Sequence, residues 1–314
     1  MVTQGPQSAF SFLISQTAYI EADAYRTKYA SIQYPDIVPV VTEANEWTRT
    51  ITHFSTDGTG QAEWFGGRAM DMPLADVTAT KYDVSVEMAA IGYDYSLEEL
   101  NQASMAGVSL SAEKAIRARR AGEELIESVV MNGNTARGWD SLIDHSGVTK
   151  MDAADGAAGT NPKYWVNKTA DEIIADVNAL LSAMWTGTNQ VEIADTLLVP
   201  PSCASILASL RIPDTMYNVG EYVMEKNIST LISRRPLMIR TVRELENAAA
   251  SGHGRIIAYR NDPEILRLHL PMPYMFGEPL QKGHYNWEVP GIFRTGGLEI
   301  RLPRALHYLD EVTA

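Results

Sequence analysis

The longest hydrophobic pattern in this chain is that of an amphipathic helix, and a helix-start signal precedes it. Ser96 and Glu99 have the spacing of a capping box, in which each side chain bonds the other residue's backbone N–H. A short helix should therefore begin at Leu97. Gly107 interrupts the pattern, and a second helix is expected from about residue 109 to residue 131.

Small residues line the buried side of this second helix. Positions at three- and four-residue steps hold Ala112, Ala115, Ala118, Gly122, Leu125, Ile126 and Val129. Four of these seven are Ala or Gly, so another backbone should pass close to the middle of the helix. The other side is charged, with Glu113, Lys114, Arg117, Arg120, Glu124 and Glu127. The helix should end at Asn132-Gly133-Asn134, where glycine supplies a left-handed turn. The short apolar segment Gly138-Trp139-Asp140-Ser141-Leu142-Ile143 follows it.

The first segment, residues 7–30, also has helical spacing. Its apolar stripe steps mostly by four and consists of Phe10, Ile14, Ala18, Ala22, Tyr25 and Tyr29. Nothing in the adjoining sequence covers this stripe, so it should dock elsewhere, on this subunit or on a neighbouring one. The proline-containing stretch 34–39 is expected to end the helix as extended chain. We interpret this segment as an arm.

Residues 47–88 change to the two-residue period of strands. A strand is expected over residues 48–53 and a returning strand over residues 81–88. Asp57-Gly58-Thr59-Gly60 is expected at the turn-rich tip, with Gly66-Gly67 further along. A two-stranded hairpin has no core of its own, so this one should lie on another surface.

Residues 166–260 predict a compact α+β lobe around a central sheet. Thr169 and Glu172 form a second capping box, which opens a helix that should end near Gly187. A strand over 196–199, a short helix through residue 210 and strands over 238–242 and 255–260 are expected to follow it. Further on, residues 293–300 are expected to form a hairpin with Gly296-Gly297 at its turn.

Composition narrows the classes of protein. The chain has 314 residues, 45% hydrophobic content and a formal net charge of −13, so it lacks the overall basic charge typical of proteins that bind nucleic acid through phosphates. The one dense basic cluster, Arg117, Arg119 and Arg120, has acidic neighbours on the same helix. A single cysteine, Cys203, excludes an internal disulfide and fits a reducing compartment. The sequence predicts neither a membrane span nor a secretory signal.

Candidate chemistry is sparse. The six histidines are scattered singly, without the spacing of a zinc site: His53, His145, His253, His269, His284 and His307. Asp144-His145 is the nearest approach to an acid–base pair, and Cys203 lies on an apolar helix face; for both, a structural role is favoured. We therefore assign no catalytic, cofactor-binding or metal-binding residue, and expect no enzyme.

The helix pattern resembles the major capsid proteins of tailed bacteriophages, the fold typified by phage Hong Kong ninety-seven. That family has a spine helix introduced by a Ser-x-Glu-Glu-Leu-like cap and closed by an Asn-Gly-(Asp/Asn) turn. Here Ser96-Leu97-Glu98-Glu99-Leu100, Asn132-Gly133-Asn134 and the segment from Gly138 to Leu142 carry the resemblance. It implies an α+β fold with an arm (1–45), an extended hairpin (46–92), a peripheral domain (93–165), an axial domain (166–283) and C-terminal strands that return to the peripheral domain (284–314).

The same resemblance implies a structural role: an icosahedral virion shell of pentamers and hexamers, assembled in the bacterial host cytoplasm and enclosing double-stranded DNA without sequence-specific contacts. A scaffold, if one is needed, would be a separate protein, since no scaffold-like extension precedes the arm; portal and decoration proteins are further candidate partners. Inter-subunit contacts are expected at Phe10, Ile14, Tyr25, Tyr29, Trp64, Phe65 and Arg68. Ser96, Glu99, Gly122 and Gly133 are expected to be structural. The alternatives are an encapsulin-type nanocompartment shell and, more remotely, a soluble α+β hydrolase.

Overall fold

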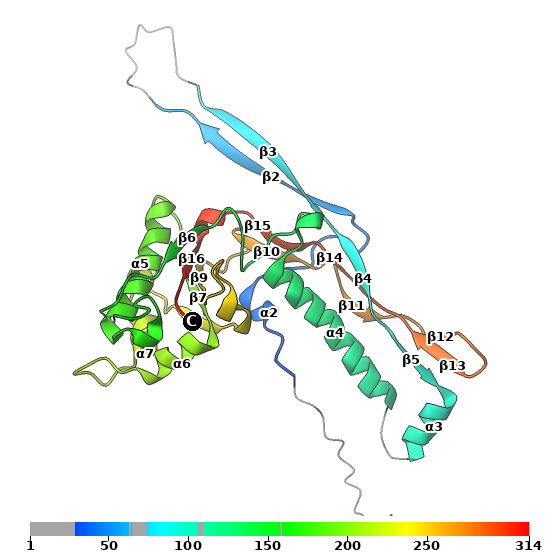
Figure 1. The fold of residues 1–314 in the computed structure, drawn as a ribbon. Coiled ribbons are helices and arrows are strands. Elements are labelled where there is room, and N and C mark those ends of the chain that lie inside the picture. The colour runs from blue at the N-terminus through cyan, green and yellow to red at the C-terminus, as the bar shows by residue number, and fades with distance from the viewer. Residues whose placement is uncertain (1–28, 63, 65–73, 106–109, 158, 314) are drawn as a thin grey trace, which may run out of the picture. The chain divides into compact units, whose positions relative to one another are not determined.

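A computed structural model describes residues 29–62, 64, 74–105, 110–157 and 159–313. The chain divides into two compact units (Figure 1). The first unit comprises residues 1–31, 91–120 and 276–291, and the second comprises residues 32–90, 121–275 and 292–314. The predicted arm helix over residues 7–28 lies outside the described residues.

The first unit combines a small sheet with two helices. Strands β12 (Leu280–Gln281), β13 (Asn286–Val289) and β5 (Tyr93–Ser96) form an antiparallel sheet in that order. Helix α3 (Leu97–Met105) follows β5 directly, and the predicted capping box is confirmed. The N–H of Glu99 donates to Ser96 Oγ at 3.1 Å, and the N–H of Ser96 donates to Glu99 Oε2 at 3.3 Å.

The predicted long helix is α4 (Leu110–Asn132), whose first half belongs to the first unit and whose second half belongs to the second. Its end is the predicted glycine turn, because Gly133 has a φ of 65° and its N–H donates to Val129 O at 2.8 Å. A side chain at Gly133 would also meet the backbone of Asp140, with a Cβ only 2.7 Å from that carbonyl. Glycine is therefore required here both for conformation and for space.

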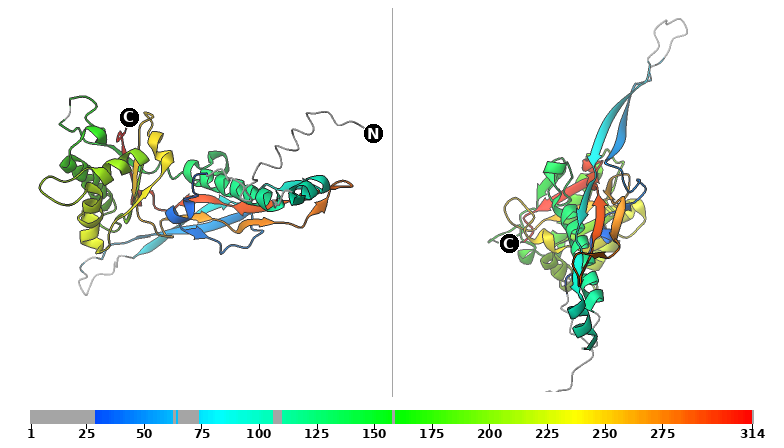
Figure 2. Two further views of the ribbon diagram at one scale, coloured as in Figure 1. Left: turned by 90° about the horizontal axis from the view of Figure 1, so that it is seen from below. Right: turned by 90° about the vertical axis from the view of Figure 1, so that its right-hand side faces the viewer.

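A five-stranded mixed sheet forms the centre of the second unit, in the order β6-β16-β9-β7-β8 (Figures 1 and 2). Its strands are β6 (Thr149–Asp152), β7 (Thr196–Val199), β8 (Met238–Thr241), β9 (Ile256–Tyr259) and β16 (Leu306–Asp310). Every residue of β7, β9 and β16 is buried. The hydrophobic core lies entirely in this unit and joins these strands to the inner face of α5, including Ile173, Leu180, Leu181 and Met184.

The helices of this lobe are α5 (Ala170–Gly187), α6 (Pro201–Ser209), α7 (Val219–Glu225) and α8 (Ile228–Ser233). The predicted α5, β7, α6, β8 and β9 are confirmed, including the capping box of Thr169 and Glu172. The short helices α7 and α8 were not predicted. The C-terminal strand β16 pairs with β6 and β9 in the five-stranded sheet, and the return of the C-terminal strands to the peripheral domain stays a prediction.

Strands β2 (Thr50–Thr59) and β3 (Asp76–Ser85) form the predicted hairpin and pair only with each other (Figure 1). The expected position of its tip is wrong: Asp57, Gly58 and Thr59 lie within β2 and pair with Thr78, Val77 and Asp76. The returning strand likewise begins at Asp76 rather than at Lys81. A β-turn signal in the sequence was thus overridden by continued cross-strand pairing.

Two three-stranded sheets complete the described chain. One has the order β1 (Val40–Val41), β10 (Leu266–His269) and β15 (Gly297–Ile300); the other has β11 (Met272–Phe276), β14 (Gly291–Thr295) and β4 (Glu87–Ala90). The predicted hairpin over residues 293–300 is wrong, because β14 and β15 belong to different sheets. Gly297, with a φ of 69°, makes the crossing between them.

Residues 34–39 were expected to be extended, yet Tyr34–Ile37 forms the short helix α2. Pro35 lies in its first turn, where the missing N–H has no helical partner to lose. Short 3₁₀ turns occur at Thr135–Arg137, Trp165–Asn167, Arg243–Asn247 and Pro303–Ala305.

Candidate assembly surfaces

The predicted contact residues fall into two groups. Phe10, Ile14, Tyr25, Phe65 and Arg68 lie outside the described residues, so their contacts stay predictions. Trp64 is described, and its side chain is fully exposed at 105% relative accessibility. The last predicted contact residue, Tyr29, is half-exposed and meets the first unit's own helix.

Two arginines of α4 hold the ring of Tyr29. The guanidinium carbons of Arg117 and Arg120 lie 4.1 Å and 4.8 Å from the ring centroid. Arg120 also donates a hydrogen bond to the carbonyl of Ala30. Part of the basic cluster on α4 therefore serves a cation–π contact with the end of the arm. This contact was not predicted, although an aromatic residue in the arm and an Arg-x-x-Arg spacing on a helix were its signals.

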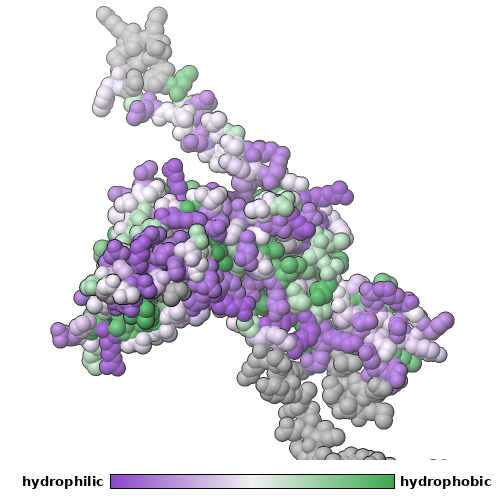
Figure 3. Space-filling view, viewed as in Figure 1, coloured by the Kyte–Doolittle hydropathy of each residue, from purple (hydrophilic) through white to green (hydrophobic). Residues whose placement is uncertain are grey.

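The hairpin presents apolar side chains to solvent along its length. Phe54 is 67% exposed, Val77 65% and Tyr82 50%, and Leu74 near its far end is 83% exposed. Figure 3 shows hydrophobic side chains interspersed with hydrophilic ones on the face in view. Since a two-stranded ribbon buries little of its own surface, these side chains are available for contact with another chain.

The first unit is also poor in buried apolar side chains. Over residues 29–31, 91–101, 112–120 and 276–291, where burial is described, the buried apolar side chains of this unit are Ala118 and Val289. Larger ones remain exposed, including Leu97, Leu100, Ile116, Leu280 and Tyr285. On one face of its sheet, Tyr95 stacks on Trp287 at 5.8 Å and Tyr93 meets Phe276 edge-on at 5.5 Å. An aromatic surface without a core beneath it is typical of a unit that is completed by a partner.

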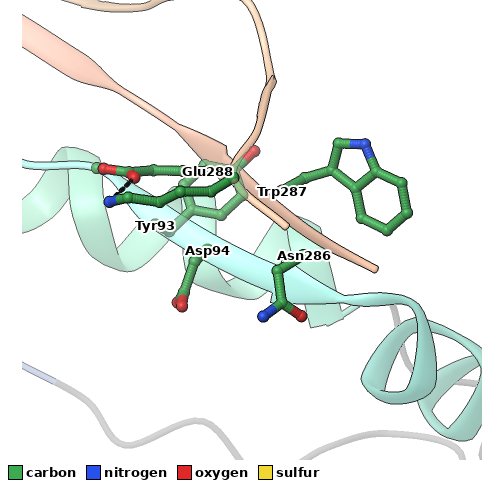
Figure 4. A pocket seen from close by; sticks show the side chains of 7 residues that line it. Tyr93, Asp94, Asn286, Trp287 and Glu288 are labelled. Carbon is green, nitrogen blue, oxygen red and sulfur yellow. Dashed lines mark hydrogen bonds and ion pairs between the residues drawn. The ribbon is translucent and has the colours of Figure 1, made fainter. Parts of the chain in front are cut away.

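A pocket of about 350 Å³ lies on this sheet (Figure 4). Its lining is mostly polar, with Asp94, Asn286 and Glu288 beside Tyr93 and Trp287. Lys282 also lines the pocket and is ion-paired with Glu288. The pocket brings together no nucleophile with a general base, so it does not form a catalytic constellation.

The structural glycine Gly122 makes room for a ring rather than for a backbone. A Cβ at this position would lie 2.7 Å from Cδ2 of Tyr274 and 3.5 Å from Cε1 of Phe293. The expectation of a close backbone is therefore wrong at this position. Ala118 and Ile126 are buried as predicted, whereas Leu125 and Ala112 are exposed.

Glu127 was expected on the solvated side of α4 but is only 6% exposed. Its carboxylate accepts a hydrogen bond of 3.0 Å from the N–H of Gln33. Burial raises the pKa of Glu127, although the Gln33 hydrogen bond opposes this effect. The residue thus ties the segment that follows the arm to the second half of α4.

The three residues considered for possible chemistry, Asp144, His145 and Cys203, are hydrogen-bonded or buried within the fold. Asp144 accepts hydrogen bonds from Lys150 at 2.6 Å and from Arg255 at 3.2 Å, and both hold its pKa below the usual range. His145 Nδ1 accepts the N–H of Gly147 at 3.1 Å. Cys203 is buried, and burial raises the pKa of its thiol, which disfavours the reactive thiolate.

Across the part of the chain that the structure describes, no three His, Cys, Asp or Glu side chains are placed to bind one metal ion. Nor does any described helix have the length and apolarity needed to cross a bilayer. An α+β fold with an exposed hairpin and a unit that buries few of its described apolar side chains is typical of a structural protein that associates with other chains.

The comparisons with known proteins agree with this class. The model of the major capsid protein family matches residues 60–312. This chain therefore belongs to the major capsid protein family. A search of curated protein sequences finds no match.

Among solved structures, the fold is similar to the capsid of Myoviridae phage XM1, with a TM-score of 0.78 at 17% identity over 94% of this chain and 97% of that one. It is also similar to a structure titled Microbacterium phage Oxtober96, with a TM-score of 0.63 at 13% identity over 96% of this chain and 98% of that one. A virus-like particle from Pyrococcus furiosus gives a TM-score of 0.50 at 14% identity over 88% and 91%. At these identities the likeness concerns the fold.

The predicted α+β capsid-type fold and the resemblance to phage capsid proteins are thereby confirmed. The chain is a structural shell subunit, as predicted, and the encapsulin alternative has no better support.

Proposed function

We propose that copies of this chain form the icosahedral head of a tailed phage, built from pentamers and hexamers and enclosing double-stranded DNA. The family match over residues 60–312 is the observation that carries this proposal. The chain would act without catalysis, reside in the virion and be assembled in the host cytoplasm. Portal, scaffolding and decoration proteins would be separate chains.

The arm and the hairpin supply the contacts between subunits in this proposal. The exposed side chains Phe54, Leu74, Val77 and Trp64 would be buried on neighbouring copies, together with Phe10, Ile14, Tyr25, Phe65 and Arg68. Stable interfaces bury more than about 1,000 Å² and use aromatic anchors, which the hairpin and the arm carry. Tyr29 would set the point at which the arm leaves α4.

The division into arm (1–45), hairpin (46–92), peripheral domain (93–165) and axial domain (166–283) is proposed on the same basis. The axial domain would include β16, since this strand completes the five-stranded sheet. The net charge of −13 suits a container whose wall repels DNA and holds it without sequence-specific contacts.

Particle content tests the proposal. Particles purified from phage-infected cells should contain nuclease-protected double-stranded DNA and no stoichiometric cargo enzyme. Protected cargo protein in place of DNA would instead favour the encapsulin-type compartment.

Removal of the arm tests the proposed contacts. A chain lacking residues 1–30 should elute as a small species on size exclusion, with the helical circular-dichroism signal of the lobe retained. A matched chain lacking only residues 1–5 should assemble normally. Normal shells from the longer truncation would contradict the role of the arm.

A further inference from the structure

A buried carboxylate in the second unit lies where the hairpin leaves the rest of that unit. Glu299 of β15 is only 4% exposed. Its Oε2 accepts hydrogen bonds from His269 Nε2 at 2.7 Å and from Arg301 Nε at 3.2 Å. Its Oε1 faces Nδ1 of His53 in an ion-pair contact. One carboxylate is thus shared by three side chains: His269 from the neighbouring strand β10, Arg301 from just after β15, and His53 from the hairpin.

His53 is the hairpin's contribution to this cluster. It lies on β2 and pairs across the hairpin with Tyr82, on whose ring it stacks at 5.1 Å and an interplanar angle of 14°. From Phe54 to Thr59 every β2 residue is exposed. His53 is therefore the last residue of β2 that is held before the strand becomes solvent-exposed on both faces.

The contact between His53 and Glu299 requires a proton. Within the described chain, His53 Nδ1 and Glu299 Oε1 are both buried and have no other hydrogen-bond partner. A nitrogen and an oxygen in this position must share a proton, because buried polar atoms are rarely left unpaired. Burial alone would raise the pKa of Glu299, but His269 and Arg301 lower it, so the carboxylate is charged at neutral pH.

The other strand of the hairpin is held closer to its base, at Ser85, which pairs with Thr50. Trp139 Nε1 donates to the carbonyl of Ser85 at 2.9 Å, and Ser85 Oγ donates to the carbonyl of Arg137 at 2.8 Å. Trp139 is 3% exposed and packs against Gly297, where a Cβ would lie 2.4 Å from the indole. The segment that contains Gly297 and Glu299 therefore meets both strands of the hairpin, one through Trp139 and one through His53.

We propose that Glu299 is a positioning residue for the extended hairpin, and that its carboxylate fixes the direction of the hairpin by holding His53. This role rests on the proposed function, since a hairpin of defined direction can meet a neighbouring copy without first losing conformational freedom. The partner it serves is a second copy of this chain.

Two substitutions of His53 separate this role from simple packing. His53→Leu removes Nδ1 and leaves Glu299 with His269 and Arg301, so its charge stays compensated and the subunit should still fold. His53→Asn places its Nδ2 close to the position of Nδ1 and should keep the contact. His284→Leu, at an exposed histidine, is the control for loss of an imidazole.

Hydrogen exchange of the full-length unassembled subunit is the first measurement. In His53→Leu, the amides of residues 50–53 and 83–85 should exchange about tenfold faster than in the wild type, the effect of losing one hydrogen bond to a charged group. His53→Asn and His284→Leu should exchange like the wild type. Equal exchange in all four proteins would overturn the proposal.

Assembly is the second measurement and separates the two proposals. Light scattering should show slower particle formation for His53→Leu than for His53→Asn at equal subunit concentration. If the wild type forms no particles while the exchange pattern holds, the shell proposal fails and the role of Glu299 stands. If the wild type assembles and His53→Leu matches it in both measurements, the role of Glu299 is refuted and the shell proposal stands.

Discussion

At the residue scale, buried ionisable side chains join distant parts of the second unit. Arg255 is fully buried, donates to both carboxylate oxygens of Asp310 at 2.5 and 2.8 Å, and donates to Ile143 O at 2.6 Å. Lys168 and Asp176 form a second buried pair, and Trp165 Nε1 donates to the same carboxylate at 3.0 Å. Buried charges are tolerated only when paired, so these two pairs hold the fold together, the Arg255 pair over a long sequence distance and the Lys168 pair over a short one.

The buried histidine His307 should make the stability of the second unit depend on pH. It is 4% exposed, its Nδ1 has no partner among the described residues, and burial lowers its pKa below 6.5. The unfolded chain therefore binds a proton more readily, and the stability that neutral His307 contributes is lost as pH falls below about 6.5. At pH 7.5 the free energy of unfolding of His307→Phe should be within about 1.5 kcal/mol of the wild-type value. At pH 5 the variant should be more stable relative to the wild type than it is at pH 7.5, because only the wild type loses stability on acidification. Urea unfolding at both pH values measures this, and a constant difference would contradict it.

The contact of Tyr29 with Arg117 and Arg120 predicts an effect of the aromatic ring alone. Tyr29→Leu should lose about 1 kcal/mol of cation–π attraction, whereas Tyr29→Phe should retain it. Tryptic cleavage after Lys28 should then be about fivefold faster in Tyr29→Leu only. Tyr285→Leu, at an exposed tyrosine of the same unit, is the control. Equal cleavage in Tyr29→Phe and Tyr29→Leu would show that the ring is not what the arginines hold.

At the element scale, α4 depends on the fit of its small residues. Gly122→Ala would gain about 1 kcal/mol of helix propensity but would force the Tyr274 ring away, which costs about 1–3 kcal/mol. The net effect should be destabilisation by about 1 kcal/mol. In a Tyr274→Leu background the ring is gone, so the same substitution should become neutral or stabilising. Urea midpoints of the four proteins measure this coupling, and an equal effect in both backgrounds would refute it.

Elements whose signals are local could be predicted from the sequence. The capping boxes at Ser96 and Thr169 predicted α3 and α5, and the apolar run over residues 196–199 predicted β7. By contrast, α7 and α8 are six or seven residues long and depend on burial of residues such as Val219 and Val223. Short helices are marginal without tertiary packing, which a local pattern does not report.

Pairings between distant segments could not be predicted in the same way. Gly296-Gly297 has the sequence of a hairpin turn, but β15 pairs with β10 and β14 pairs with β4. His53, His269 and Glu299 give no signal individually. The pairing of β10 with β15 brings His269 close to Glu299, and the hairpin adds His53. The candidate contact residues followed from a different signal, side chains such as Phe10, Ile14 and Trp64 that have no evident partner nearby in the sequence. Of all the candidates, the structure describes Trp64 and Tyr29.

At the scale of the whole molecule, the shell should be held together without covalent links through the hairpin. An isopeptide bond needs an amine nucleophile near the hairpin tip, and residues 47–80 contain no lysine. Lys81 pairs with Phe54 midway along the hairpin and is ion-paired with Asp83 at 2.8 Å. Boiled mature particles should run as one band near 34.6 kDa on a denaturing gel. A ladder of covalent oligomers would contradict this and would point to Lys81.

We expect this chain to complete itself by association with its own copies. Its first unit buries few apolar side chains among the described residues, and its hairpin is exposed along most of both strands. Electron microscopy of the purified full-length protein, expressed alone or with its neighbouring phage genes, tests this most directly. Closed, uniform shells with icosahedral symmetry are expected. A protein that stays monomeric or dimeric under both conditions would contradict it.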